Sequence, residues 1–545
     1  MSLLTLSTVA TTSCSKSDSK QEILDKQGTK LIVKVSGIAD EQSSITTKGS
    51  ITATTKAPKI INYPEFDATV SVDNNLPASP IARITQGANF NLSSSISSSG
   101  AKAENMADLV KYRLFIFKQD GTFVDSESMA AGSTGSISLE PGNYKWAALS
   151  YNDETPVDDL TVGGSTDIVL PGGKDVLYAN GDVTIADGNS SNISITFKRK
   201  YSRLGIELNT MGMFANMENA NVVVSGLSVT KATIKMFDGG LKDFVSDPQT
   251  INYASFTNVD PSYSDAKIAY IYTANNAQSE VKVAVSNLTI RLDDGNPRNF
   301  TQTANFTFPI TPVMGKSYRL LTNLIESPLT IERTATLSGT KYTTQWARQN
   351  VYYQAGHNPY RFHHTYKKSA DRNSFFSFGS NNPLKAGKDG DPCANVYPAG
   401  VWKSPTAQDY YMLVGGGLVP NFSALSPTYN TDYTEYTSST GTEGPYPSKN
   451  LRFYDNGQYI NLGLVEDLIN VQLGSTGRGH YWTGSAGIDL LGLLSLGAIS
   501  YETASTGGLF NAPINRTILN IGDIQLLSAL DVVKSNLKNV RCVRK

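Results

Sequence analysis

The chain offers few side chains that could carry out catalysis or hold a metal ion. It contains 4 histidines and 3 cysteines among 545 residues. His363 and His364 are adjacent, so in a strand they would point to opposite faces and could not chelate one ion. No His-Glu-x-x-His motif, phosphate-binding glycine loop or nucleophile elbow is present. We therefore predict that the protein is not an enzyme and has neither a metal site nor a cofactor.

Acidic residues do not change this prediction. Asp293–Pro297 and Asp455–Gly457 are turn sequences, and neither has the alternating acidic pattern of a calcium-binding loop. An enzyme acting on surface polysaccharide would need paired carboxylates in one cleft, and the sequence shows no convincing pair. Such an enzyme is the weakest of the functions considered below.

Two of the cysteines, Cys393 and Cys542, are 149 residues apart (542 − 393). In an exported protein, two cysteines that close a loop the size of a domain predict a disulfide. In the chain-entropy model a loop of this length contributes about 4–5 kcal/mol to stability. The alternative is a pair of free buried thiols.

The third cysteine, Cys14, follows a short apolar stretch that ends in small residues and precedes a polar tether. This arrangement resembles a bacterial lipoprotein signal, in which Cys14 would be lipidated and become the mature N-terminus. The alternative is a disordered leader with an incidental cysteine. No later segment has the ~18 unbroken apolar residues of a membrane helix, so the lipid would be the only membrane anchor.

Composition and charge favour an all-β protein with a polar, weakly charged surface. Lys and Arg number 47 against 48 Asp and Glu, a net charge of −1, which disfavours a nucleic-acid binder. Only 17% of residues are charged, whereas 27 Tyr and 45 Gly favour strands joined by turns. The length predicts three or four domains.

Alternating apolar residues predict many short strands without intervening helices, as in antiparallel β-sandwiches. The expected strands include 31–36, 68–72, 112–118, 144–151, 192–198, 204–208, 222–229, 281–285 and 318–322. Around residue 340 the character changes to long loops rich in Tyr, Trp and Asn. Ser404 is the expected N-cap of a helix through Leu413, with Pro405 at its first position. A final strand is expected over 536–543.

The strand-and-turn motifs of residues 105–325 resemble those of the fimbrillin superfamily of Bacteroidia-type pili. The motifs are Tyr112–Phe117 with Asp120-Gly121, Glu140–Tyr144, Leu177–Asp182 and Ile195–Leu204. This resemblance implies two transthyretin-like antiparallel β-sandwiches.

Residues 346–545 resemble the Fibrobacter-type major paralogous domain, which is related to C-type-lectin-like folds. The motifs are Trp346–Asn350, Asp391–Cys393, Pro398–Trp402, Pro405-Thr406, Gly479–Trp482 and Asn539–Arg544. This resemblance also supports the Cys393–Cys542 disulfide. The expected fold class is therefore mainly β, with two pilin-type sandwiches and an α+β lectin-like domain. The expected divisions are 1–29 (signal and tether), 30–198, 199–335 and 345–545.

The resemblance to the fimbrillin superfamily implies polymerisation by strand exchange. In that family a protease removes an N-terminal strand after Arg or Lys, and a strand of the next subunit fills the space. Here residues 31–36 are the candidate strand, and Lys48, Lys56 and Arg83 are the candidate processing sites. The alternative is an edge strand that is never removed. Because the chain ends in a folded domain, we expect it to accept a strand and not donate one, as a fimbrial tip adhesin would.

The terminal domain would then present the ligand-binding surface. Aromatic rings beside amides and hydroxyls suit a glycan or protein surface on a host or bacterial cell. The candidate residues are Tyr360, His363, Tyr410, Tyr411 and His480. Trp346, Trp402 and Trp482 are expected to pack in the core.

The leading hypothesis is a cell-surface pilus tip subunit, found in the outer membrane as a lipoprotein or in the fimbrium. Its expected partners are other pilin subunits and a surface ligand, with no nucleic acid. The alternative is a lipid-anchored surface glycan-binding protein that does not polymerise.

Overall fold

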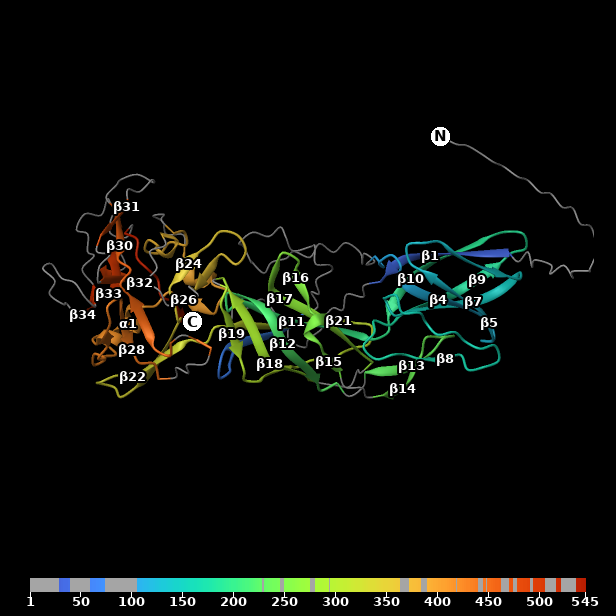
Figure 1. Cartoon of the computed structure of the whole chain (residues 1–545), viewed down its shortest axis with the longest axis horizontal. Coiled ribbons are helices and arrows are strands. Elements are labelled where there is room, and N and C mark those ends of the chain that lie inside the picture. The colour runs from blue at the N-terminus through green and yellow to red at the C-terminus, as the bar shows by residue number, and fades with distance from the viewer. Residues whose placement is uncertain are drawn as a thin grey trace, which may run out of the picture.

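The computed structural model describes most of the chain from Thr29 to Lys545. The described residues are 29–39, 59–73, 105–227, 230–245, 249–274, 280–293, 295–362, 372–383, 390–417, 419–439, 445–446, 448–461, 470–473, 478–490, 494–504, 516–520 and 536–545. The chain forms three parts: a first β-sandwich, a second β-sandwich and a C-terminal part. They follow one another along an elongated molecule, with the first sandwich at one end and the C-terminal part at the other (Figure 1). The C-terminus lies beside the second sandwich, away from the far end of the molecule (Figure 1).

The first sandwich is built on a seven-stranded sheet. Its strands, in spatial order, are β5 (Phe123–Ala130), β4 (Lys111–Lys118), β7 (Gly142–Ser150), β9 (Leu177–Ile185), β10 (Ser191–Arg199), β1 (Thr29–Ile38) and β6 (Gly135–Leu139). The sheet curls so that β6 returns towards β5. Alternating side chains such as Leu114 and Ile116 fill the concave face, where β1 contributes Leu31 and Val33. The predicted turn at Gly121 connects β4 to β5 with a φ of +91°.

The opposite face of this sheet is covered by a small sheet whose strands come from two parts of the chain. Its order is β14 (Leu241–Val245), β13 (Lys231–Lys235) and β8 (Asp167–Val169). Ile234 of β13 is buried with Phe115 and Leu149 of the seven-stranded sheet. The hydroxyl of Tyr178 donates to the carbonyl of Met236 at 2.8 Å. Residues 231–245 therefore fold with the first sandwich, whereas the sequence placed them in the second.

The second sandwich packs a six-stranded sheet against a five-stranded one. The first has the order β16 (Thr257–Asp260), β17 (Tyr263–Thr273), β11 (Ser202–Gly212), β21 (Ser317–Ile325), β3 (Asp67–Asp73) and β2 (Ile60–Asn62). The second has β15 (Gln249–Ile251), β12 (Ala215–Ser225), β18 (Val281–Leu292) and β19 (Pro297–Phe300), with β20 (Ala304–Phe308) also paired to β18. A short 3₁₀ helix spans Tyr253–Ser255.

Strands β2 and β3 also depart from the expected division of the chain. They precede the first sandwich in sequence, yet β3 pairs antiparallel with β21 along its whole length. Phe66, just before β3, is buried in the core of the second sandwich. The expected boundary at residue 198 is therefore crossed in both directions, because each sandwich buries strands that the chain supplies from beyond it.

The sequence pattern predicts antiparallel sandwiches, but two of the strand pairs are parallel. β1 runs parallel to β10, and β11 runs parallel to β21. Alternation of apolar residues reports which face of a strand is buried, and it contains no information about the direction of the neighbouring strand.

The C-terminal part is an assembly of small sheets around one helix. The strand pairings are β22 (Leu329–Thr334), β23 (Lys341–Trp346), β35 (Val543–Arg544) and β26 (Trp402–Lys403); β24 (Val351–Tyr353) with β25 (Tyr360–Phe362); β27 (Thr428–Tyr429), β28 (Tyr433–Tyr436) and β29 (Leu451–Tyr454); β30 (Gln458–Asn461) with β31 (Asn470–Leu473); and β32 (Arg478–Leu490), β33 (Leu494–Ala504) and β34 (Arg516–Asn520). Two 3₁₀ helices span Arg372–Ser374 and Pro392–Asn395.

The helix α1 (Ala407–Val414) forms where the sequence predicted one, but its cap differs. Thr406, not Ser404, is the N-cap, and it forms a capping box with Asp409. Ser404 instead donates its hydroxyl to Asp391 at 2.7 Å. The expected final strand over 536–543 is reduced to isolated bridges and the two residues of β35. The helix is far shorter than a membrane span, and none in the described part of the chain is long and apolar enough to be one.

The position of β13 can be tested by truncating Ile234. We expect Ile234→Ala to destabilise the first sandwich by about 2–5 kcal/mol, because it leaves a cavity in that core. Hydrogen exchange should then accelerate at the amides of β4 and β7. The control is Val223→Ala on β12, whose side chain is 46% exposed. Faster exchange confined to β12 and β18 would show that β13 belongs with the second sandwich.

Candidate functional site

The candidate strand for exchange, β1, lies between two other strands of the first sheet. It pairs in parallel with β10 from Leu31 to Ile38 and antiparallel with β6 from Thr29 to Val33. Its backbone therefore satisfies hydrogen-bonding groups on both neighbours. We call the position between β10 and β6 the β1 slot.

The inward side chains of β1 complete the core of the first sandwich. Leu31 and Val33 are fully buried and Ile38 is 2% exposed, all within one apolar cluster. Val35 is half-buried and packs against the same cluster. At ~25 cal/mol per Å² of apolar surface, burial of such side chains contributes about 1.5–3 kcal/mol each. The sequence predicted this strand and its inward face over 31–36, but not the start of the strand at Thr29 or its extension to Ile38.

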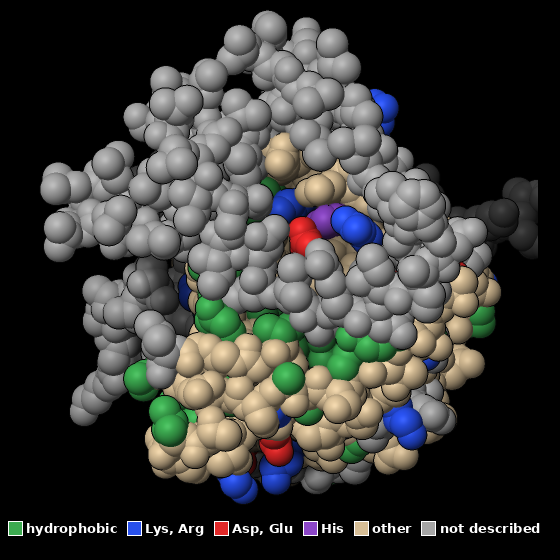
Figure 2. Space-filling model, turned by 90° about the vertical axis from the view of Figure 1, so that its left-hand side faces the viewer, with side chains coloured by type: hydrophobic (Ala, Val, Ile, Leu, Met, Phe, Trp, Pro, Cys, Tyr) green, Lys and Arg blue, Asp and Glu red, His purple; other side chains and the backbone are tan. Residues whose placement is uncertain are grey.

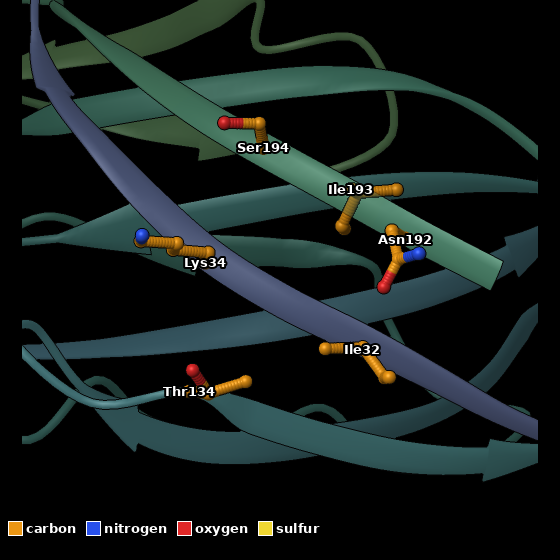
Figure 3. A pocket seen from close by; sticks show the side chains of 6 residues that line it. All are labelled: Ile32, Lys34, Thr134, Asn192, Ile193 and Ser194. Carbon is orange, nitrogen blue, oxygen red and sulfur yellow. The ribbon is translucent and has the colours of Figure 1, made fainter. Parts of the chain in front are cut away.

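The outer face of β1, which includes Ile32, Lys34 and Ser36, borders an open depression (Figure 3). The residues that line it come from β1, from β10 and from the position before β6; they are Ile32, Lys34, Thr134, Asn192, Ile193 and Ser194. Next to it the hydroxyls of Ser36 and Ser194 are in hydrogen-bond contact across the two strands. β1 is therefore exposed to solvent along one face and buried along the other.

The other end of the chain is buried. Residues 537–544 are all buried. β35 pairs on one side with Trp346 of β23 and on the other with β26, so it is an interior strand of its sheet. The predicted disulfide joins Cys393 to Cys542, and both cysteines are fully buried. The last strand is thus fixed both by pairing and by a covalent bond.

Arg544 links this strand to the second sandwich. Its guanidinium lies 3.9 Å from the centre of the Trp402 ring and donates from Nη2 to Asp67 Oδ2 at 2.8 Å. The same nitrogen donates to the backbone carbonyl of Glu326, also at 2.8 Å. Asp67 begins β3, so the N-terminal strand pair and the C-terminal residues meet at one buried ion pair.

Burial changes the pKa of both groups more than their mutual attraction does. It raises the pKa of Asp67 to about 6 and lowers the pKa of Arg544 to about 10, although each partner opposes the change. Glu326 lies within the electrostatic reach of Arg544, and Arg348 within that of Asp67. The Arg348 guanidinium also lies 3.8 Å from the centre of the Tyr446 ring.

Further polar contacts extend the interface between the second sandwich and the C-terminal part. The Tyr397 hydroxyl donates to Asn323 Oδ1 at 2.5 Å and accepts from Asn209 Nδ2 at 3.1 Å. His357 Nε2 lies 2.8 Å from Asp265 Oδ2. Such directional contacts, together with the buried ion pair, fix the orientation of the two parts relative to each other.

Two residues of the expected ligand surface are not at the surface. Tyr410 is fully buried and stacks on Tyr501, with ring centroids 4.8 Å apart. His480 is 4% exposed and its Nδ1 lies 3.3 Å from Glu502 Oε1, across β32 and β33. The expectation that these two contact a ligand is wrong, because helix α1 and the cross-strand pairing turn them inward.

The other expected ligand residues have different environments. Tyr360 is half-buried and donates its hydroxyl to the carbonyl of Asn381 at 2.9 Å. Tyr411 is half-buried on α1, and His363 lies outside the described residues. The predicted core tryptophans are confirmed: Trp346, Trp402 and Trp482 are 0%, 1% and 2% exposed. Figure 2, which faces the far end of this part, shows histidine, acidic and basic side chains close together.

The remaining candidates from the sequence, Cys14, Lys48, Lys56 and Arg83, lie outside the described residues. Their positions along the chain are still informative. Lys48 and Lys56 lie between β1 and β2, and Arg83 lies between β3 and β4. Among the described residues no group of His, Cys, Asp and Glu has the arrangement of a metal site.

Comparison with known proteins supports the fimbrillin-like resemblance. Residues 150–346 match the model of the fimbrillin-like family. A fimbrillin-like match agrees with the predictions that the chain is fimbrial and is not an enzyme. The match ends at Trp346, after the first two strands of the C-terminal part, and does not extend over the segment with the lectin-like resemblance. No relative is found among curated proteins.

Solved structures give weaker similarities. A candidate cell adhesion protein from Bacteroides fragilis aligns at 14% identity over 46% of this chain and 88% of its own, with a TM-score of 0.30. The fimbrial anchor protein of Porphyromonas gingivalis aligns at 13% identity over 45% and 91%, with a TM-score of 0.24. A fimbrial assembly protein from Parabacteroides distasonis aligns at 10% identity over 43% and 86%, with a TM-score of 0.24. Scores this low establish no shared fold, and no function is transferred from these proteins.

The raised pKa of Asp67 predicts the direction of a pH effect. The folded state binds the Asp67 proton more tightly than the unfolded state does, so stability falls as pH rises from about 4 to about 6. For a shift of ~2 pK units this loss is about 3 kcal/mol. The Asp67→Asn variant cannot lose that proton. We therefore expect the native protein to lose stability relative to Asp67→Asn over this range, measured by denaturant unfolding.

An exposed carboxylate provides the control. Asp108→Asn removes one negative charge from the surface of the first sandwich, so it reports the effect of net charge alone. A native protein that gains stability relative to Asp67→Asn between pH 4 and pH 6 would contradict the account. That result would mean that attraction to Arg544 exceeds the cost of burial.

Proposed function

We propose that this protein is the tip subunit of a fimbrium, which accepts a strand from the next subunit in the β1 slot. The observation that carries the proposal is the position of β1 between β10 and β6. A strand so placed can be replaced by another strand that makes the same backbone hydrogen bonds, which is the mode of recognition called β-augmentation. The fimbrillin-like match over residues 150–346 supports the same function.

Removal of β1 would leave a site suited only to another strand. The facing backbone groups of β10 and β6 would lose their partners, and the apolar sites of Leu31, Val33 and Ile38 would be empty. An open edge beside an empty apolar groove is unstable in water. A strand with apolar residues at alternate positions satisfies both requirements at once.

Residues 537–544 are buried and fixed in the fold, which favours a subunit that does not donate these residues as a strand. A subunit inside the fibre must donate a strand as well as accept one. Here the last strand is interior to its sheet and held by the Cys393–Cys542 disulfide. Withdrawal of residues 537–544 would expose a buried segment and break the Arg544–Asp67 pair. The C-terminal part would therefore be the adhesive end, presenting a surface for a glycan or a protein on another cell.

The strands around the processing candidates favour Lys48 and Lys56 over Arg83. Cleavage after either lysine would release β1 and leave β2 and β3 in the mature chain. Cleavage after Arg83 would also detach β3. This strand pairs with β21, and its Asp73 forms an ion pair with Arg319 at 2.6 Å. We further propose that Cys14 is lipidated, so that the precursor reaches the outer membrane as a lipoprotein before cleavage.

This proposal can be tested on pili sheared from the producing cell. We expect the double variant Lys48→Gln/Lys56→Gln to keep β1 and to be at least tenfold depleted from the sheared pili, measured by quantitative mass spectrometry. The matched control, Arg83→Gln, should be processed and incorporated as the native protein is. Incorporation of the double variant with β1 still attached would overturn strand acceptance in the β1 slot. Absence of the native protein from the sheared pili would overturn the fimbrial role and leave a lipid-anchored glycan-binding protein that does not polymerise.

A further inference from the structure

The inward residues of β1 do not follow a strict alternation. Leu31, Val33 and Val35 are two residues apart and face the core of the first sandwich, whereas the next inward side chain is Ile38. Their spacing is therefore i, i+2, i+4 and i+7. In a regular strand the fourth inward residue would be at i+6.

A bulge on β1 causes the change of phase. Val35 pairs with Ile195 and Gly37 pairs with Thr196, so Ser36 is an extra residue on β1 between two consecutive residues of β10. Gly37 has a φ of +135°, a conformation that residues with a side chain rarely adopt. A residue that tolerates positive φ therefore directly follows the extra residue of the bulge.

The bulged half of β1 has a paired neighbour on one side only within the described strands. β6 pairs with β1 up to Val33, whereas β10 continues to Ile38. Beyond the strand, the amide of Ala39 donates to the carbonyl of Phe197 at 2.7 Å. The site of Ile38 is thus set by β10, whose Ile195 and Phe197 are fully buried. These residues would stay in place if β1 left.

We propose that the strand that replaces β1 in the assembled fibre carries the same bulged pattern. It would present branched apolar residues at i, i+2, i+4 and i+7, and glycine at i+6. This inference rests on the proposed function and names the chemistry of the partner. A strand with strict alternation would place its fourth apolar residue out of register and leave the Ile38 site empty.

Peptides can test the register directly. The protein would carry a specific protease site in the connection between β1 and β2, so that β1 is cut from the otherwise complete chain and exchanged for labelled peptides. The reference peptide is the sequence of residues 29–39. Deletion of Ser36 converts it to strict alternation with Ile at i+6, and Gly37→Val removes the tolerance of positive φ. Lys34→Gln changes only the outer face and is the matched control.

We expect the reference and Lys34→Gln peptides to bind with equal affinity. The peptide without Ser36 should bind about 30-fold or more weakly, as an unfilled site for a large aliphatic side chain predicts. Gly37→Val should also weaken binding, by about tenfold or more. Equal binding of the reference and the peptide without Ser36 would overturn the register and leave strand acceptance intact. Failure of every peptide to bind would overturn strand acceptance, and this inference with it.

Discussion

The backbone groups at the edges of β10 and β6 need a hydrogen-bonding partner, and β1 supplies that partner to both. The same strand places Leu31 and Val33 in the core of the first sandwich, so the sheet and its core are completed together. Backbone pairing does not depend on sequence, whereas the filling of apolar sites does. A strand from another subunit can therefore replace β1 if its side chains match the core, which makes the β1 slot the centre of the proposed assembly.

Unlike β1, the residues at the other end of the chain are fixed in place. The last residues are interior to a sheet, joined to Cys393 by a disulfide and paired through Arg544 with Asp67. Strand β3, which contains Asp67, also pairs with β21 along its whole length, and β13 packs on the first sandwich. The sandwiches thus share strands supplied by each other's segments, and the C-terminal part is fixed to the second. A load applied to the C-terminal part would pass through these contacts to the β1 slot.

The sequence predicted the elements of this arrangement better than their partners. The strand at 31–36, the turn at Gly121, the core tryptophans and the Cys393–Cys542 disulfide are all present. The division expected from the sequence assigned β3 and β13 to the other sandwich, because alternation identifies a buried face and not the strand beside it. Tyr410 was placed at the surface for a related reason: an aromatic ring suits a ligand site and a core equally well. One feature of the sequence, the glycine at position 37 directly after Ser36, could have indicated the bulge.

The most direct test of strand replacement is to lock β1 in place. The hydroxyls of Ser36 and Ser194 are in contact, so cysteines at both positions would be within reach of a disulfide across β1 and β10. The measurement is the amount of Ser36→Cys/Ser194→Cys protein in sheared pili, with each single variant as control. The account predicts that the locked protein is absent from the pili, that the single variants are present, and that a reductant during assembly restores the double variant. Normal incorporation of the locked protein would show that β1 never leaves its slot.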